Sequence, residues 1–321
     1  SSGTVNSWVS EFGDRFDGST ALVTGATGFI GRRLCEALCL LGADVVGLSR
    51  SAARTNLPAG VRPLALDLTD WQETRDRLSD DRYDAVFHLA GNVSARPDRD
   101  LVLPMLQSHV IGTASLLDAI TERGCERFVL LGSSEEPRVS GDGAEAGSPY
   151  AAAKVAARQL ALMYHRLYGL PVVALRLFLT YGPGQADTKL VPYAIRSLLD
   201  GRNTSLSSGS KICDGIYLDD AVRGLLMAAT ASDEALGGCF DLGAGAGITV
   251  RQLVERIAAL VGASARLAFG EMPDRIGEES GSADLEQTTA ILGWTPNWGT
   301  DAGLNHTIRH YNERLVVEAP R

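Results

Sequence analysis

A glycine-rich turn near the start of the chain constrains its fold more than any other segment. It reads Thr24-Gly25-Ala26-Thr27-Gly28-Phe29-Ile30-Gly31 and stands between a β-rich run, 21–24, and a helical pattern, 29–41. Glycines spaced by three let the backbone turn sharply, let a pyrophosphate approach the start of the helix, and let the helix close on the strand. The pattern predicts a dinucleotide-binding turn whose contacts come from Gly25, Thr27, Gly28, Phe29, Ile30 and Gly31.

Strand and helix patterns alternate after this turn. Further strands are predicted at 45–48, 61–66, 85–89, 128–131 and 172–177, and the helical patterns between them cover 70–79, 101–123 and 150–168. Strands joined by helical crossovers form a parallel sheet that is covered on both faces. The chain is therefore predicted to have a Rossmann-like, doubly wound α/β fold.

The rhythm changes after Tyr181, where short mixed elements and helices near 188–200, 219–231 and 250–261 follow. This change predicts a smaller mixed α/β C-terminal lobe that binds substrate. The expected division is an N-terminal extension, 1–18; a dinucleotide-binding domain, 19–182, with later returns near 212–242; and a substrate-binding lobe made of 183–211 and 243–321.

The N-terminal extension has apolar side chains at helical spacing on one face, namely Val5, Trp8, Val9, Phe12 and Phe16. A short isolated helix is marginal in water, so this one is expected to pack on its own body or on another subunit. A frayed chain end is the alternative.

Composition excludes several classes of protein. Among 321 residues there are 30 basic and 39 acidic side chains, a net charge of −9, so no basic excess favours a nucleic-acid partner. The five cysteines are an odd number without CxxC pairs, which argues against a disulfide framework and a metal site. No apolar run approaches the roughly 20 residues of a membrane span, and no signal peptide is recognised. We expect a cytoplasmic protein with reduced thiols.

The end of the second predicted strand bears on the choice of cofactor. It reads Ser49-Arg50 and carries no acid that would hold a ribose 2′-hydroxyl, while Arg32 and Arg33 are expected to add positive charge nearby. This pattern favours NADP(H) over NAD(H), although Arg50 could instead be a surface charge. Residues expected to line the rest of the cofactor site are Asp67, Leu68, Leu89, Ala90 and Gly91.

A tyrosine and a lysine four residues apart, Tyr150 and Lys154, open the helix that follows the fifth strand. They share one helical face, and a nearby ammonium lowers the pKa of a phenol, which suits acid-base chemistry. Ser133 and Ser134 end the preceding strand, where a hydroxyl can bond a reacting carbonyl.

Together these motifs resemble the extended short-chain dehydrogenase/reductase family over about residues 20–311. That family includes sugar-nucleotide epimerases, dehydratases, decarboxylases and 4-ketoreductases. The resemblance also rests on the segments His88-Leu89-Ala90-Gly91, Tyr181-Gly182-Pro183-Gly184-Gln185, Ile216-Tyr217-Leu218-Asp219-Asp220 and Leu292-Gly293-Trp294-Thr295-Pro296. It implies that Tyr150 is the acid-base residue, that Lys154 holds the nicotinamide ribose, and that Ser133 or Ser134 polarises the substrate oxygen.

The chain departs from this family where substrate phosphates are usually bound. Leu179 stands in place of the usual asparagine and Cys213 in place of the usual arginine, so two hydrogen-bond donors are missing. Lys211 and Arg275 are the residues that could compensate.

Two further positions leave alternatives open. Glu135 matches a carboxylate of the dehydratase and decarboxylase relatives, but it could be a solvated loop acid, because Glu136-Pro137-Arg138 replaces the usual Val-Tyr-Gly after it. His109, on an apolar helix, is either a structural residue or a proton relay.

The first hypothesis for function is an NADPH-dependent ketoreductase in which Tyr150 supplies the proton. Its substrate is either a nucleotide-activated keto-sugar or a carbonyl compound of secondary metabolism, such as antibiotic biosynthesis. The alternatives are a redox-neutral sugar-nucleotide epimerase or dehydratase with tightly bound NAD, and a cofactor-binding protein without turnover. By analogy of fold we expect a homodimer through a helix pair that includes 150–168.

Overall fold

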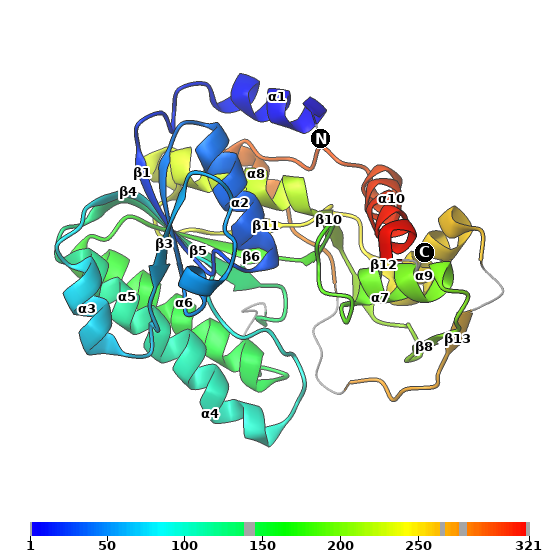
Figure 1. Cartoon of the computed structure of the whole chain (residues 1–321). Coiled ribbons are helices and arrows are strands. Elements are labelled where there is room, and N and C mark those ends of the chain that lie inside the picture. The colour runs from blue at the N-terminus through cyan, green and yellow to red at the C-terminus, as the bar shows by residue number, and fades with distance from the viewer. Residues whose placement is uncertain (1, 138–144, 264–266, 276–280, 319–321) are drawn as a thin grey trace.

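A parallel sheet forms the centre of the molecule (Figure 1). The structure is a computed structural model and describes residues 2–137, 145–263, 267–275 and 281–318. Within these residues the sheet has seven strands in the order β11-β6-β5-β4-β1-β2-β3, and every pair is parallel. The strands are β1 (Thr20–Thr24), β2 (Asp44–Ser49), β3 (Val61–Ala65), β4 (Tyr83–His88), β5 (Cys125–Ser133), β6 (Val172–Leu177) and β11 (Cys239–Leu242).

Helices cover both faces of this sheet. Figure 1 shows α2 (Phe29–Leu40) and α8 (Leu218–Thr230) on one face, and α3 (Trp71–Leu78), α5 (Gly112–Thr121) and α6 (Pro149–Tyr168) on the other. Successive side chains of β1 point to opposite faces of the sheet. Val23 packs in the same buried cluster as α2 and α8, whereas Leu22 packs with α3 and α5. The prediction of a doubly wound α/β fold is confirmed.

The helical stretch predicted at 101–123 is present, but its middle is π-helical instead of regular α-helix. The 3₁₀ turn η2 (Arg99–Leu101) and the short helix α4 (Val102–Met105) lead into the π-helical segment η3 (Leu106–Ile111), and only then does α5 begin. Pro104 removes a backbone donor from this stretch. The wider π turns carry His109, whose Nε2 lies 2.7 Å from the Asn92 carbonyl oxygen. Periodicity alone does not distinguish such a segment from regular α-helix.

A separate buried cluster holds the C-terminal part together. It includes Tyr181, Leu253 and Tyr311. The helices around it are α7 (Leu190–Leu199), α9 (Val250–Val261) and α10 (Thr300–Glu318). Paired short strands join them: β7 (Leu179–Tyr181) with β10 (Gly215–Tyr217), β8 (Thr204–Leu206) with β13 (Leu267–Phe269), and β9 (Ile212–Cys213) with β12 (Ile248–Thr249). The remaining short elements are the 3₁₀ turns η1 (Ala52–Arg54) and η4 (Asp233–Ala235) and the π-helical segment η6 (Thr288–Leu292). The proposed domain boundaries stay a prediction.

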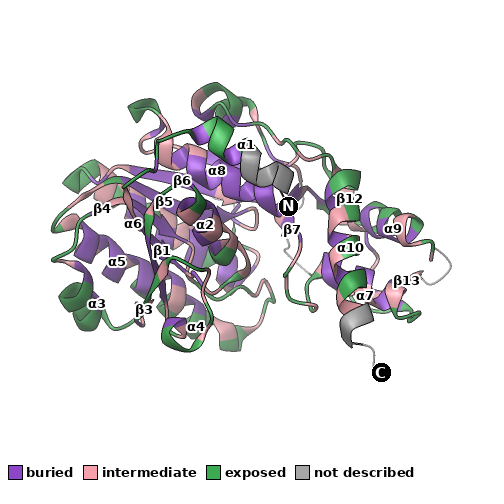
Figure 2. Cartoon of the chain, turned by 45° about the horizontal axis from the view of Figure 1, so that its top comes forward, coloured by how far each residue is buried: buried purple, intermediate pink, exposed green. Residues whose placement is uncertain are grey.

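The N-terminal helix α1 (Ser2–Phe12) packs on the body of its own chain. Trp8 and Phe12 are buried in the core cluster that contains α2 and α8, together with Phe16. Figure 2 shows α1 beside α8, which is buried along most of its length. The guanidinium of Arg33 lies 4.7 Å from the centre of the Trp8 ring. The side chain of Val5 lies outside the described residues.

Replacing Trp8 with alanine tests how much this helix contributes to stability. Trp8 is 2% exposed, so Trp8→Ala is expected to lower the free energy of unfolding by about 3–5 kcal/mol. Val9 is 47% exposed, and Val9→Ala is expected to change it by less than about 0.5 kcal/mol. Urea unfolding followed by fluorescence measures both values, and equal effects of the two substitutions would contradict the packing described here.

Candidate active site

One large cavity, with a volume of about 1840 Å³, lies at the carboxyl ends of the sheet strands and extends to the second lobe. Parallel sheets bind ligands at this edge, because the strands end there together. The structure brings together at this cavity all the residues predicted for the site: Gly25, Thr27, Gly28, Phe29, Ile30, Gly31, Ser49, Arg50, Asp67, Leu68, Leu89, Ala90, Gly91, Ser133, Ser134, Glu135, Tyr150, Lys154, Leu179, Cys213 and Arg275. Their individual roles stay predictions.

The turn after β1 forms one end of the cavity. Gly25 has a φ of +72°, and a Cβ added to Gly31 would lie 2.2 Å from the Gly25 carbonyl oxygen. Only glycine at position 31 therefore lets α2 approach the turn this closely. No side-chain hydrogen bond caps the start of α2 at Gly28, so the backbone and dipole of this end remain available to an anion.

The tip of β2 carries Ser49 and Arg50 at the rim of the cavity. Ser49 Oγ is buried and has no hydrogen-bond partner among the described residues, which fits a site for a cofactor hydroxyl or phosphate. The expectation for Arg33 is wrong. Its guanidinium donates to Asp219 at 2.7 Å and faces α8, because the buried Trp8 ring and the Asp219 carboxylate hold it there. Arg32 donates to the Asn56 carbonyl oxygen.

The buried side chain of His88 links the segments behind the glycine turn by hydrogen bonds. Thr24 Oγ1 accepts hydrogen bonds from the N–H groups of Leu89 and Ala90, so its own proton goes to His88 Nδ1, 2.8 Å away. The proton of the imidazole is then on Nε2, which donates to Thr113 Oγ1 at 2.9 Å. Burial lowers the pKa of His88 to about 3, so the ring is neutral. This chain of bonds joins β1, β4 and α5.

Tyr150 and Ser133 face each other in the middle of the cavity. Ser148 caps α6 by accepting from the Ala151 N–H at 3.1 Å, and this places Tyr150 in the first turn of the helix. The Tyr150 side chain is hydrogen-bonded to that of Ser133. Lys154, one turn further along, donates from Nζ to the Leu131 carbonyl oxygen at 2.7 Å.

Burial is the main cause of the pKa shifts of Tyr150 and Lys154. The pKa of Tyr150 is raised to about 12 by burial and, to a smaller extent, by the charges of Glu136 and Glu135, although the bond to Ser133 opposes the rise. The expectation that Lys154 lowers the pKa of Tyr150 is therefore wrong, because burial shifts this pKa in the opposite direction. Burial also lowers the pKa of Lys154 to about 8, and Glu136 partly offsets this shift.

His109 lines the same cavity and packs against Tyr150, with ring centres 5.3 Å apart. Its Nε2–H donates to the Asn92 carbonyl oxygen, and burial lowers its pKa to about 4. Gly91 makes room for this ring, since a Cβ at Gly91 would lie 2.1 Å from His109 Cε1. These contacts favour the structural interpretation of His109 over the proton relay.

The substrate end of the cavity is bounded by an ion pair between the two lobes. Lys211 Nζ donates to Glu135 Oε1 at 3.0 Å, so Glu135 is not a solvated loop acid. Leu179 of β7 and Cys213 of β9 also line the cavity, and neither carries a charge. The second lobe contributes the cations Lys189, Lys211 and Arg275 to the lining of the cavity.

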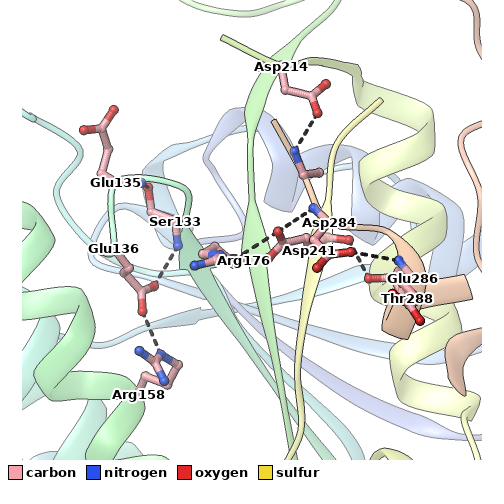
Figure 3. A network of polar contacts seen from close by, with 11 residues as sticks. Ser133, Glu135, Glu136, Arg158, Arg176, Asp214, Asp241, Asp284, Glu286 and Thr288 are labelled. Atoms are coloured by element: carbon pink, nitrogen blue, oxygen red, sulfur yellow. Dashed lines mark hydrogen bonds and ion pairs between the residues drawn. The ribbon is translucent and has the colours of Figure 1, made fainter. Parts of the chain in front are cut away.

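Sequence reasoning missed Glu136 and Arg158. Glu136 is 1% exposed; its Oε1 accepts from the Ser133 N–H and its Oε2 from Arg158 Nε, both at 2.8 Å (Figure 3). The available signal was the spacing of Tyr150, Lys154 and Arg158 along one face of α6. Arg138 lies outside the described residues.

No group of three or more His, Cys, Asp or Glu side chains that could hold a metal occurs in the described part of the chain. No helix in that part is both long enough and apolar enough to span a bilayer.

A doubly wound sheet, a glycine turn at its edge and a facing Ser-Tyr-Lys set define a nicotinamide-dependent enzyme. The chain belongs to the NAD dependent epimerase/dehydratase family, whose model matches residues 21–243. The resemblance to extended short-chain dehydrogenases/reductases is thereby confirmed.

Relatives of known function match nearly the whole chain. A dTDP-glucose 4,6-dehydratase of Actinoplanes sp. is 30% identical over 90% of this chain and 97% of the relative. A UDP-glucose 4-epimerase of Mycolicibacterium smegmatis is 30% identical over 91% and 98%. The solved structure of MoeE5 in complex with UDP-glucuronic acid and NAD is 30% identical, covers 92% of this chain and 100% of that one, and has a TM-score of 0.82.

The buried ammonium predicts a specific pH dependence of stability. The pKa of Lys154 is about 8 in the folded protein and 10.5 in the reference state. Between these values the unfolded chain binds more protons, so the contribution of Lys154 to stability rises as the pH rises. Urea unfolding of wild type and Lys154→Met should therefore show the wild type gaining relative to the variant from pH 8 to pH 10.5. Parallel curves would contradict the burial of a charged lysine.

Proposed function

We propose that this chain is a redox-neutral enzyme that acts on a sugar nucleotide, as an epimerase or dehydratase with a retained nicotinamide cofactor. The observation that carries the proposal is the continuity of one cavity from the glycine turn, past Ser133 and Tyr150, to the cations of the second lobe. The relatives that match over nine tenths of the chain include epimerases and dehydratases of sugar nucleotides. The proposal replaces net ketone reduction as the first hypothesis.

The residues at the cofactor end fit a dinucleotide. The backbone of the turn from Gly25 to Gly31 and the start of α2 would hold the pyrophosphate, and Ser49 Oγ would reach the adenosine ribose. Lys154 would hold the nicotinamide ribose. When bound, the nicotinamide supplies the group that takes up a hydride from the sugar and returns it.

Tyr150 moves the proton at the sugar oxygen. As a phenolate it accepts the hydroxyl proton while the carbon is oxidised, and as a phenol it returns the proton when the carbonyl is reduced. Ser133 bonds the same oxygen, because its hydroxyl already lies at hydrogen-bond distance from Tyr150. The high pKa of Tyr150 favours the phenol, which is the form that donates to a carbonyl oxygen.

The charges for a diphosphate would come from Lys189, Lys211 and Arg275. They would bind the phosphates in place of the asparagine and the arginine that the family usually has where this chain has Leu179 and Cys213. Lys211 is already paired with Glu135, so a substrate phosphate would compete with that carboxylate.

The second candidate is the NADPH-dependent ketoreductase. Arg50, exposed at the rim beside Ser49, favours it, because an arginine at the tip of β2 suits a 2′-phosphate and a net reductase uses NADPH. The neutral side chains Leu179 and Cys213 extend this candidate to carbonyl substrates without a nucleotide, such as those of secondary metabolism.

The decisive measurement is turnover of UDP-glucose, UDP-glucuronate and dTDP-glucose by the purified protein. We expect product without net consumption of NADH or NADPH, and a kcat lower by about 10²–10⁴ in Tyr150→Phe. Tyr164→Phe, on the same helix, serves as the control and should retain activity. Consumption of one NADPH per product with a 4-keto sugar nucleotide, which offers the carbonyl that a reductase needs, would establish the second candidate instead. Absence of turnover with all three sugars would reject the first.

The expected homodimer and cytoplasmic location also stay proposals. Large apolar side chains are exposed on adjacent segments, among them Leu103 at 70% and Leu106 in α4 and η3, and Met163 and Leu167 in α6. Such a face suits the predicted helix pairing. All five cysteines are free thiols, which agrees with a reducing compartment.

Charge placed on this face should prevent the dimer. Leu167 is 57% exposed, and Leu167→Glu is expected to halve the mass measured by sedimentation equilibrium, because a carboxylate would be buried at the interface. Val9→Glu, on the opposite side of the sheet, is the control. A monomeric wild type would contradict the proposal.

A further inference from the structure

Ser133, at the end of β5, is attached to α6 at two separate points. The first is the hydrogen bond between the side chains of Ser133 and Tyr150. The second runs through Glu136, whose carboxylate accepts from the Ser133 N–H and from Arg158 Nε at 2.8 Å each (Figure 3). Ser133 is thus held through its backbone and its side chain by residues two helical turns apart.

The backbone around Ser133 is built to admit this carboxylate. A Cβ at Gly132 would lie 2.4 Å from Glu136 Oε1, so any side chain there would displace it. The Glu136 N–H donates back to the Ser133 carbonyl oxygen at 3.0 Å, which closes a tight turn. The Glu135 N–H donates to Ser133 Oγ at 3.2 Å. The N–H, the carbonyl and the hydroxyl of Ser133 therefore all have assigned partners.

Tyr150, Lys154 and Arg158 follow each other at intervals of four along α6 and share one face of the helix. We propose that Glu136 is a positioning residue which, held by Arg158, fixes the Ser133 hydroxyl relative to Tyr150. Its role in catalysis rests on the proposed function, since Glu136 is not among the residues that line the cavity. It acts through the backbone of Ser133.

Several titratable groups surround the Glu136 carboxylate, so a single substitution of Glu136 would change the local electrostatics as well as the position of Ser133. Arg158 and Lys154 face it from α6, Arg176 faces it from β6, and Cys239 faces it from β11. Its charge also contributes to the raised pKa of Tyr150. Removing one member of a buried pair leaves the other uncompensated, and the test therefore compares variants that both lack the pair of charges.

The two double variants are Glu136→Gln with Arg158→Met and Glu136→Ala with Arg158→Met. Both remove the same charges, but only glutamine retains an oxygen that accepts from the Ser133 N–H. We expect the glutamine variant to have a kcat about 10- to 100-fold above that of the alanine variant, because misplacement of a reacting group by about 1 Å costs this much. The KM for the sugar nucleotide should differ by less than about threefold.

Amide hydrogen exchange at Ser133 supplies a readout that needs no substrate. The amide should be protected in the wild type and in the glutamine variant and should exchange at least about tenfold faster in the alanine variant, relative to neighbouring amides of β5. Equal kcat values in two folded double variants, or an unprotected Ser133 amide in the wild type, would overturn the inference.

Failure of the proposed function would look different. If the wild type converts none of the sugar nucleotides, that proposal is rejected, while unequal protection of the Ser133 amide in the two double variants would still support the attachment through Glu136. If neither double variant folds, protection of Ser133 in the wild type decides, because its N–H donates to the Glu136 carboxylate at 2.8 Å in the structure.

Discussion

The close approach of α2 to the turn after β1 sets the geometry of the cavity. It depends on the absence of a side chain at Gly31, where a Cβ would collide with the Gly25 carbonyl oxygen. Long-range contacts then hold α2 in this position: Arg33 bonds Asp219 of α8 and covers Trp8 of α1. Because the glycine turn and the ends of β4 and β5 meet at one edge, a displacement of α2 would open the site where a dinucleotide and Tyr150 must meet.

The site combines groups that are costly to bury. The Lys154 ammonium donates to the Leu131 carbonyl oxygen, and the Tyr150 side chain is buried. The ion pair of Glu136 and Arg158 is bonded to the Ser133 N–H. Each buried charge has a partner, as burial in a low dielectric requires. The opposite pKa shifts of Tyr150 and Lys154 have the same cause, since burial disfavours the anion of one and the cation of the other.

Much of the fold was predictable because its signals are local. Alternating strands and helices, the glycine turn and the spacing of Tyr150 and Lys154 all depend on residues close together in the sequence. The π-helical segment within the helix predicted at 101–123 was not predicted, because periodicity does not distinguish π turns from α turns. The position of Arg33 was predicted wrongly because its partner Asp219 is remote in the chain.

The sequence by itself determined the class of fold, the dinucleotide turn and the residues gathered at the cavity. Only the tertiary structure decided which of them touch: Ser133 with Tyr150, Glu135 with Lys211, and Glu136 with Arg158. It also reversed the expected pKa shift of Tyr150, because a pKa depends on how far a group is removed from water. That burial is produced by packing between segments far apart in the chain, and no local pattern of residues records it.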